Sequence, residues 1–104
     1  MTAPSIDHAE ANVLRELAGH FYALKDAMRL EMIALLAHRD ECTVSEMAAA
    51  LKKSQPLVSW HLRRLKTAGV VKMRRSGRVV YCSLDRDSIA RYQQEFRRLI
   101  QRAP

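Results

Sequence analysis

The sequence predicts a small, mainly α-helical domain of about five helices with one two-stranded β-hairpin. Three observations lead to this expectation. Apolar residues recur at helical spacing over most of the 104 residues, capping residues precede these stretches, and the segment from Val70 to Leu84 reads instead as two strands around Ser76-Gly77. A chain of this length holds one core, so we expect a single domain over residues 1–104, with residues 1–5 as a flexible tail.

Polar residues mark the starts of the first three predicted helices. Ser5 or Asp7 precedes the first helix, and Asp26 precedes the second. Thr43 lies three residues before Glu46, which is the spacing of a capping box at the start of the third. Apolar residues follow each cap with the period of one helix face, so each helix is expected to bury one side.

The fourth predicted helix runs from Ser54, a capping residue, to Ala68, and Gly69 follows it where a left-handed residue usually ends a helix. Lys52-Lys53 form the tight turn before it. Its apolar residues make a narrow stripe, Val58, Leu62 and Leu65. The other side of this helix is therefore polar and basic.

Strands over Val70–Arg74 and Arg78–Leu84 and a last helix over Asp85–Arg102 complete the prediction. The last helix has acidic residues at its start and arginines at its end, which suits the helix dipole. Two short helices joined by a tight turn and followed by a basic hairpin describe a winged helix-turn-helix. One side of its second helix can pack on the protein while the other reaches base edges in a major groove.

The positive charge lies in one contiguous third of the chain. From Met47 to Leu84 there are nine Lys or Arg and no Asp or Glu, whereas the other residues hold nine basic and eleven acidic side chains, a net of −2. The net charge of +7 therefore comes from this segment alone. Such a surface attracts phosphate backbones and predicts a nucleic-acid partner.

Four segments in this order, LKDAMRLEMIALL, TVSEMAAAL, SQPLVSWHLRRLKTAGVV and SGRVVYCSL, resemble the ArsR/SmtB family of dimeric winged-helix transcriptional repressors. The resemblance covers roughly Leu24 to Leu84. It implies a sequence-specific repressor that binds a palindromic operator in double-stranded DNA as a homodimer. The expected homodimer interface is formed by the first and last helices: Val13, Leu17, Ile89, Tyr92, Phe96 and Leu99.

The resemblance makes residues 54–68 the recognition helix. Gln55, Ser59 and His61 hold its contact positions, and Arg63 or Arg64 is expected to read a base, with the choice between the two arginines left open. The expected contacts to the DNA backbone are the polar and basic residues of the turn and wing: Lys52, Lys53, Ser54, Arg74, Arg75 and Arg78. Trp60 would lie either against sugar or thymine methyls, or over the stems of neighbouring arginines.

The sequence departs from the family at its metal sites, so we expect no metal and no cofactor. The positions of a Cys-x-Cys motif hold Thr43 and Ser45, and the last helix has no histidine. His8 and His20 would be about 18 Å apart on one helix, too far to share a metal ion. The inducer is therefore unknown from the sequence.

Two cysteines leave one regulatory alternative open, a thiol-based redox sensor. Cys82 reads as a buried small hydrophobe, and Cys42, just before a helix, is expected to be the more reactive thiol. A second alternative is a winged-helix module that binds another protein. No catalytic constellation, membrane span or signal peptide is recognised, so we expect a cytoplasmic protein that is not an enzyme and makes no membrane contact.

Overall fold

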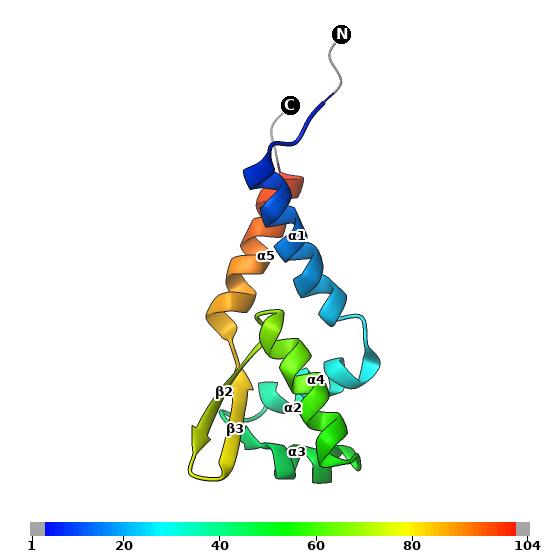
Figure 1. Cartoon of the computed structure of the whole chain (residues 1–104), viewed down its shortest axis with the longest axis vertical. Coiled ribbons are helices and arrows are strands. Elements are labelled where there is room, and N and C mark those ends of the chain that lie inside the picture. The colour runs from blue at the N-terminus through cyan, green and yellow to red at the C-terminus, as the bar shows by residue number, and fades with distance from the viewer. Residues whose placement is uncertain (1–3, 102–104) are drawn as a thin grey trace.

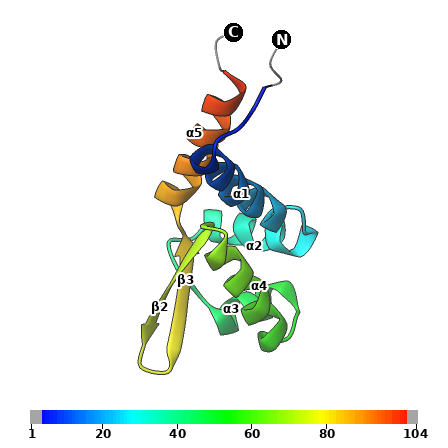
Figure 2. The same cartoon turned by 45° about the horizontal axis from the view of Figure 1, so that its top comes forward.

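The computed structural model describes residues 4–101, in which five helices and three strands form an elongated molecule with extents of 59 × 23 × 21 Å. The elements are, in chain order, α1 (His8–Ala23), α2 (Ala27–Ala37), β1 (Cys42–Thr43), α3 (Val44–Leu51), α4 (Gln55–Thr67), β2 (Val71–Ser76), β3 (Val79–Leu84) and α5 (Arg86–Ile100). Helices α1 and α5 lie side by side as an arm at one end, and α2–α4 and the hairpin form the body at the other (Figures 1 and 2).

Each described helix begins where a capping side chain accepts a hydrogen bond from a backbone N–H three residues later. The capping residues are Asp7, Asp26, Thr43, Ser54 and Asp85. At α3 the Glu46 carboxylate also accepts from the Thr43 backbone N–H at 3.0 Å, which completes the predicted capping box. The predicted helices are thus confirmed, with their starts, although the described part of the last one ends at Ile100 and the tail predicted over residues 1–5 lies largely outside the described range.

The sheet has one more strand than the sequence predicted. Its order is β1-β3-β2, and the added strand pairs Cys42 with Cys82 and Thr43 with Tyr81. The hairpin is also longer at its tip, because β2 continues to Ser76 and the turn is Gly77-Arg78, with a φ of +60° at Gly77. Glycine adopts this left-handed conformation without steric cost, which favours the two-residue hairpin turn.

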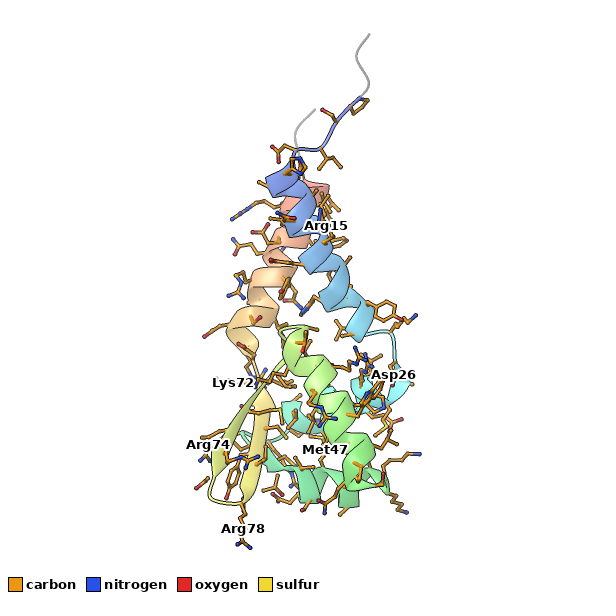
Figure 3. The ribbon with its side chains drawn as sticks, in the orientation of Figure 1. Arg15, Asp26, Met47, Lys72, Arg74 and Arg78 are labelled. Atoms are coloured by element: carbon orange, nitrogen blue, oxygen red, sulfur yellow. The ribbon has the colours of Figure 1, made fainter. Side chains whose placement is uncertain are left out.

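The core lies in the body, between α2, α3, α4 and the inner face of the sheet. The predicted stripe of α4 is fully buried there, with Val58, Leu62 and Leu65 each 0% exposed. Met47 of α3 points into the same core (Figure 3). The narrow apolar face therefore anchors α4 while most of its surface stays exposed.

His20 joins the arm to the body. This buried residue of α1 donates a hydrogen bond from Nδ1 to the carbonyl oxygen of Ala68 at 2.7 Å and stacks on Tyr92 of α5, with ring centroids 4.1 Å apart. The Asp85 N–H donates to the carbonyl oxygen of Val70 at 2.9 Å, which fixes the start of α5 beside the end of α4. The arm and α4 are thus held together by directed bonds.

Candidate functional site

A groove opens between the N-terminal half of α4, the start of α3 and the hairpin. Its volume is about 570 Å³, and it is lined by Thr43, Val44, Ser45, Gln55, Ser59, Arg78, Val79, Val80 and Tyr81. Three predicted DNA-contact residues, Gln55, Ser59 and Arg78, thus come together although 23 positions separate the first from the last. Arg78 lies at the hairpin tip, where its side chain extends away from the helices (Figure 3).

The turn before α4 presents two exposed cations. Lys52 has a left-handed backbone with a φ of +56°, and the Lys53 N–H donates to the carbonyl oxygen of Ala48 at 3.0 Å, so this corner is closed by α3 itself. The Ser54 hydroxyl accepts from the Leu57 N–H at 3.3 Å. Ser54 therefore has a structural role as the cap of α4, separate from its predicted contact with the DNA backbone.

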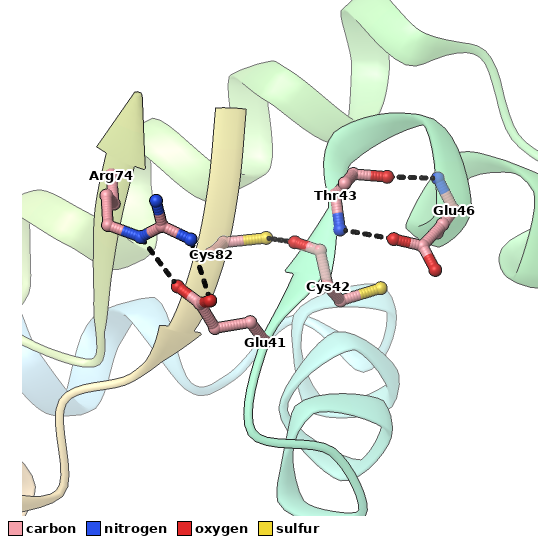
Figure 4. A network of polar contacts seen from close by, with 6 residues as sticks. All are labelled: Glu41, Cys42, Thr43, Glu46, Arg74 and Cys82. Atoms are coloured by element: carbon pink, nitrogen blue, oxygen red, sulfur yellow. Dashed lines mark hydrogen bonds and ion pairs between the residues drawn. The ribbon is translucent and has the colours of Figure 1, made fainter. Parts of the chain in front are cut away.

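Arg74 differs from the expectation of a free wing cation. Its guanidinium donates two hydrogen bonds to the Glu41 carboxylate, at 2.9 and 3.1 Å (Figure 4). Its Cζ atom also lies 4.4 Å from the centre of the Tyr81 ring. The guanidinium lowers the pKa of Glu41, which raises that of Arg74 in turn. The basic segment is thus not free of acidic neighbours, because Glu41 enters from outside it; Arg75 and Arg78 make no ion pair among the described residues.

His61 also departs from its predicted role. The side chain is buried, with 6% of its surface exposed, and its Nδ1 accepts a hydrogen bond from Nε of Arg29 in α2 at 3.0 Å. Burial lowers the pKa of His61; the Asp26 carboxylate opposes this shift, and the Arg29 cation acts in the same direction as burial. The ring packs on the core side of α4 and is not available to meet a base edge.

The two adjacent arginines of α4 have different surroundings. Arg64 lies over the Trp60 ring, with 5.0 Å between its Cζ atom and the ring centre. Arg63 is exposed and makes no ion pair or ring contact among the described residues. Trp60 therefore packs against arginine, as one of its two interpretations held, and Arg63 is the freer of the two cations.

The two cysteines are directly opposite each other in the β1–β3 pairing, a proximity that the sequence could not show. The Cys82 thiol donates to the carbonyl oxygen of Cys42 at 2.9 Å, and the Cys42 Sγ points away from it (Figure 4). Both are buried; desolvation raises the pKa of Cys42 and raises that of Cys82 to about 12. Because the thiolate is the reactive form, neither side chain has the properties of a ready nucleophile.

The residues predicted for the dimer interface fall into three groups: packed within the chain, exposed, and partly buried. Leu17 is only 5% exposed and Tyr92 stacks on His20, so these two already pack within the chain. Val13 and Phe96 are each 42% exposed, and the Phe96 ring meets Phe21 edge to face at 5.3 Å. The arm thus keeps an apolar seam, to which Ile100 adds a 64% exposed side chain. Ile89 and Leu99 are partly buried.

Sequence reasoning missed Arg29 and Glu41. Arg29 carried a signal, because it shares the helical spacing of Met32 and Leu36 on the buried face of α2. Glu41 carried none, since its partner is 33 positions away. Among residues 4–101 no group of three or more His, Cys, Asp or Glu is placed to hold a metal ion. Over the same residues no helix is long and apolar enough to cross a membrane.

Comparison with known proteins identifies the family of this chain. The model of the family described as "Bacterial regulatory protein, arsR family" matches residues 26–73. The cadmium resistance transcriptional regulatory protein CadC homolog of Staphylococcus aureus is 35% identical over 83 residues, which cover 80% of this chain and 68% of that protein. The chain belongs to the ArsR family.

Other relatives agree with this membership. The transcriptional repressor SmtB homolog of Synechocystis is 42% identical over 80 residues, or 77% of this chain, but the match spans only 56% of that protein's length. The solution structure of the homodimeric winged helix-turn-helix DNA-binding domain Mb0332 from Mycobacterium bovis has a TM-score of 0.75 and 26% identity, over 99% of this chain and 94% of that one. The fold of this ArsR-family chain is a winged helix-turn-helix.

Proposed function

We propose that this ArsR-family chain is a transcriptional repressor that binds a palindromic operator as a homodimer. Helix α4 enters the major groove, and the hairpin lies along the adjacent backbone. The observation that carries the proposal is the groove that brings Gln55, Ser59 and Arg78 together at the edge of the basic surface. A repressor of this kind works in the cytoplasm, where bacterial DNA lies.

The surroundings of each side chain indicate whether it would contact a base edge or a phosphate. Gln55, Ser59 and Arg63 are free to meet base edges, since amide, hydroxyl and guanidinium groups are the usual partners there. Lys52, Lys53, Arg75 and Arg78 supply the phosphate contacts that fix register. Arg74 contributes less than its charge suggests because Glu41 already binds it.

The homodimer is formed by the apolar seam of the arm. Val13 of α1 and Phe96 and Ile100 of α5 are large exposed apolar side chains. Both helices form the arm at the end of the molecule away from α3 and the hairpin (Figure 1). A second copy would bury these side chains and place two α4 helices on one face of the duplex. Half-sites about one helical turn apart, roughly 34 Å, would then be read together.

Selection of bound duplexes from a random pool tests this function. We expect an inverted repeat to be enriched, and the affinity for random duplex DNA to fall steeply as salt is raised, because several phosphates are neutralised. Enrichment of no sequence, together with binding that is insensitive to salt, would instead favour the protein–protein module.

Two substitutions test the assigned contacts. Arg63→Ala should cost about 1–3 kcal/mol of operator binding and relax the preference at one base pair. Ser59→Ala should weaken operator binding without altering dimerisation. Arg15→Ala is the matched control, because Arg15 is an exposed arginine on α1 in the arm (Figure 3). Operator affinities that match the Arg15→Ala control for both substitutions would remove α4 from the interface.

A further inference from the structure

A second cavity lies on the other flank of α4, where α1, α2 and α5 meet it. Its volume is about 430 Å³, within the range of small-molecule sites. It is lined by Glu16, Gly19, His20, Tyr22, Ala23, Arg29, Trp60, Arg64, Thr67, Ala68 and Tyr92. None of the groove residues contributes to it, so the two hollows are separate.

A buried cation without an anionic partner forms one wall of this cavity. Arg29 is 8% exposed; its Nε donates to the neutral acceptor His61 at 3.0 Å, and its Nη1 is 3.4 Å from the Ala23 carbonyl oxygen. No carboxylate lies within 4.0 Å of its guanidinium among residues 4–101. Buried charges are normally paired, because desolvation is costly. The Asp26 carboxylate accepts from the Arg29 backbone N–H at 3.2 Å but forms no ion pair with the guanidinium, so the Arg29 side chain can still pair with an anion.

The other walls specify the rest of the occupant. Arg29 and Arg64 both lie over the Trp60 ring, at 5.5 and 5.0 Å from its centre, and Tyr92 stacks on His20 nearby. The two guanidiniums and the single lining carboxylate, Glu16, leave a net charge of +1. This combination of flat aromatic surfaces and one excess positive charge suits a monoanion with an aromatic ring.

The cavity stays accessible in the proposed homodimer. Glu16 and Gly19 line it, whereas the apolar seam contains Phe21, which contacts Phe96. At 100° per residue, Glu16 and Gly19 lie about 140–160° around α1 from Phe21. Val13, the other seam residue of α1, lies only about 60° from Glu16 and lines a neighbouring hollow together with it. A second copy seated on the seam therefore borders the cavity at Glu16 and leaves its Gly19 side open.

We propose that this cavity is a binding site for a small aromatic carboxylate, whose carboxylate pairs with Arg29 and whose ring lies against Trp60. A guanidinium binds a carboxylate through two parallel hydrogen bonds, which gives the site its preference for a planar anion. The occupant touches Trp60, Arg64 and Thr67 of α4 from the flank that does not face the groove. Its effect on DNA affinity rests on the proposed function, but its binding does not.

The cavity contains its own reporter, because Trp60 is the single tryptophan of the chain. Phenylacetate and phenylacetamide are probes of the same shape that differ in charge. Titrated into the full chain without DNA, phenylacetate should change the Trp60 fluorescence saturably, and phenylacetamide should bind at least tenfold more weakly. Equal binding of the two probes, or no change with phenylacetate, would overturn the proposal.

Two variants identify the site. Arg29→Gln removes the guanidinium and should weaken phenylacetate binding at least tenfold. Gly19→Leu is independent of any buried charge: Gly19 lines the cavity, and a Cβ added there meets no atom within 4 Å, so a larger side chain has room to start toward the cavity. It should abolish the titration, whereas Gly19→Ala, the matched control, should retain it. Phenylacetate binding to Gly19→Leu with wild-type affinity would place the probe elsewhere and refute the site.

A parallel measurement of DNA binding distinguishes failure of this site from failure of the proposed function. Phenylacetate should shift the affinity for the selected operator in the wild type and leave it unchanged in Gly19→Leu. A saturable fluorescence change in a chain that does not bind DNA would uphold the site and remove only the operator. DNA binding without any fluorescence change would uphold the proposed operator binding and refute the phenylacetate site.

Discussion

Gly69 follows the end of α4 and lies against the start of α5, and its replacement by alanine tests how the arm is attached. Its φ is +75°, and an added Cβ would lie 2.6 Å from the Ser88 Oγ and 2.8 Å from the Tyr92 Cε2. Both atoms belong to α5. Alanine there would be strained by its own backbone and would also collide with the neighbouring helix.

The cost follows from these two effects. A left-handed backbone costs an L-residue about 1–2 kcal/mol, and overpacking costs about 1–3 kcal/mol. The reduced freedom of the unfolded chain returns about 0.4–1 kcal/mol. We therefore expect Gly69→Ala to lower the free energy of unfolding by about 1–5 kcal/mol, the sum of these three contributions.

The chain offers two matched controls. Gly77 has a φ of +60° but nothing within 4 Å of an added Cβ, so Gly77→Ala should cost only about 1 kcal/mol. Gly19 lies inside α1 in open space, so Gly19→Ala should stabilise by about 1 kcal/mol through helix propensity. Urea unfolding at one fixed protein concentration measures all three, since dimerisation would otherwise shift the midpoint. A Gly69→Ala variant as stable as Gly77→Ala would refute the contact with α5.

Three further outcomes are expected. Because burial lowers the pKa of His61, the unfolded chain takes up a proton at this residue more readily than the folded chain does. The contribution of His61 to stability should be fully present above about pH 6.5 and should decline below it. His61→Gln should therefore reduce the difference in the free energy of unfolding between neutral pH and about pH 5.5. A pH dependence identical in both proteins would contradict this assignment. Phe96→Asp should convert the dimer to monomer in sedimentation, whereas Gln94→Asp on the other side of α5 should not; a dimeric Phe96→Asp protein would exclude the seam. Cys42 and Cys82 should react with a maleimide slowly in the folded chain and rapidly in urea, because burial raises the pKa of both thiols. Mass spectrometry of the labelled protein measures both rates. Rapid labelling of the folded chain would instead favour the thiol-based redox sensor.

Local chemistry made most of the fold predictable. Asp7, Asp26, Thr43 and Ser54 mark helix starts because each bonds a backbone N–H only three residues away. Strand β1 escaped prediction because two residues carry no periodicity and form a strand only through their pairing with β3.

The sequence predicted as DNA contacts three residues that line one groove, Gln55, Ser59 and Arg78, but not the bonds that the other predicted contact residues make within the chain. His61 lies three residues after Val58 and four before Leu65, so its spacing already placed it beside the buried stripe. What permits a histidine there is the bond from Arg29, 32 positions away, which no local pattern contains. The same holds for Arg74 and Glu41: pairing between distant surface residues depends on the finished fold.

The bond from His20 to Ala68 ties the arm to the end of α4. In the proposed homodimer, the angle at which two arms cross would therefore fix how far apart, and in what relative orientation, the two copies of α4 stand. One base pair added between half-sites rotates one of them by about 35° around the duplex. A pair of helices coupled in this way would discriminate sharply between operators that differ only in the length of their centre.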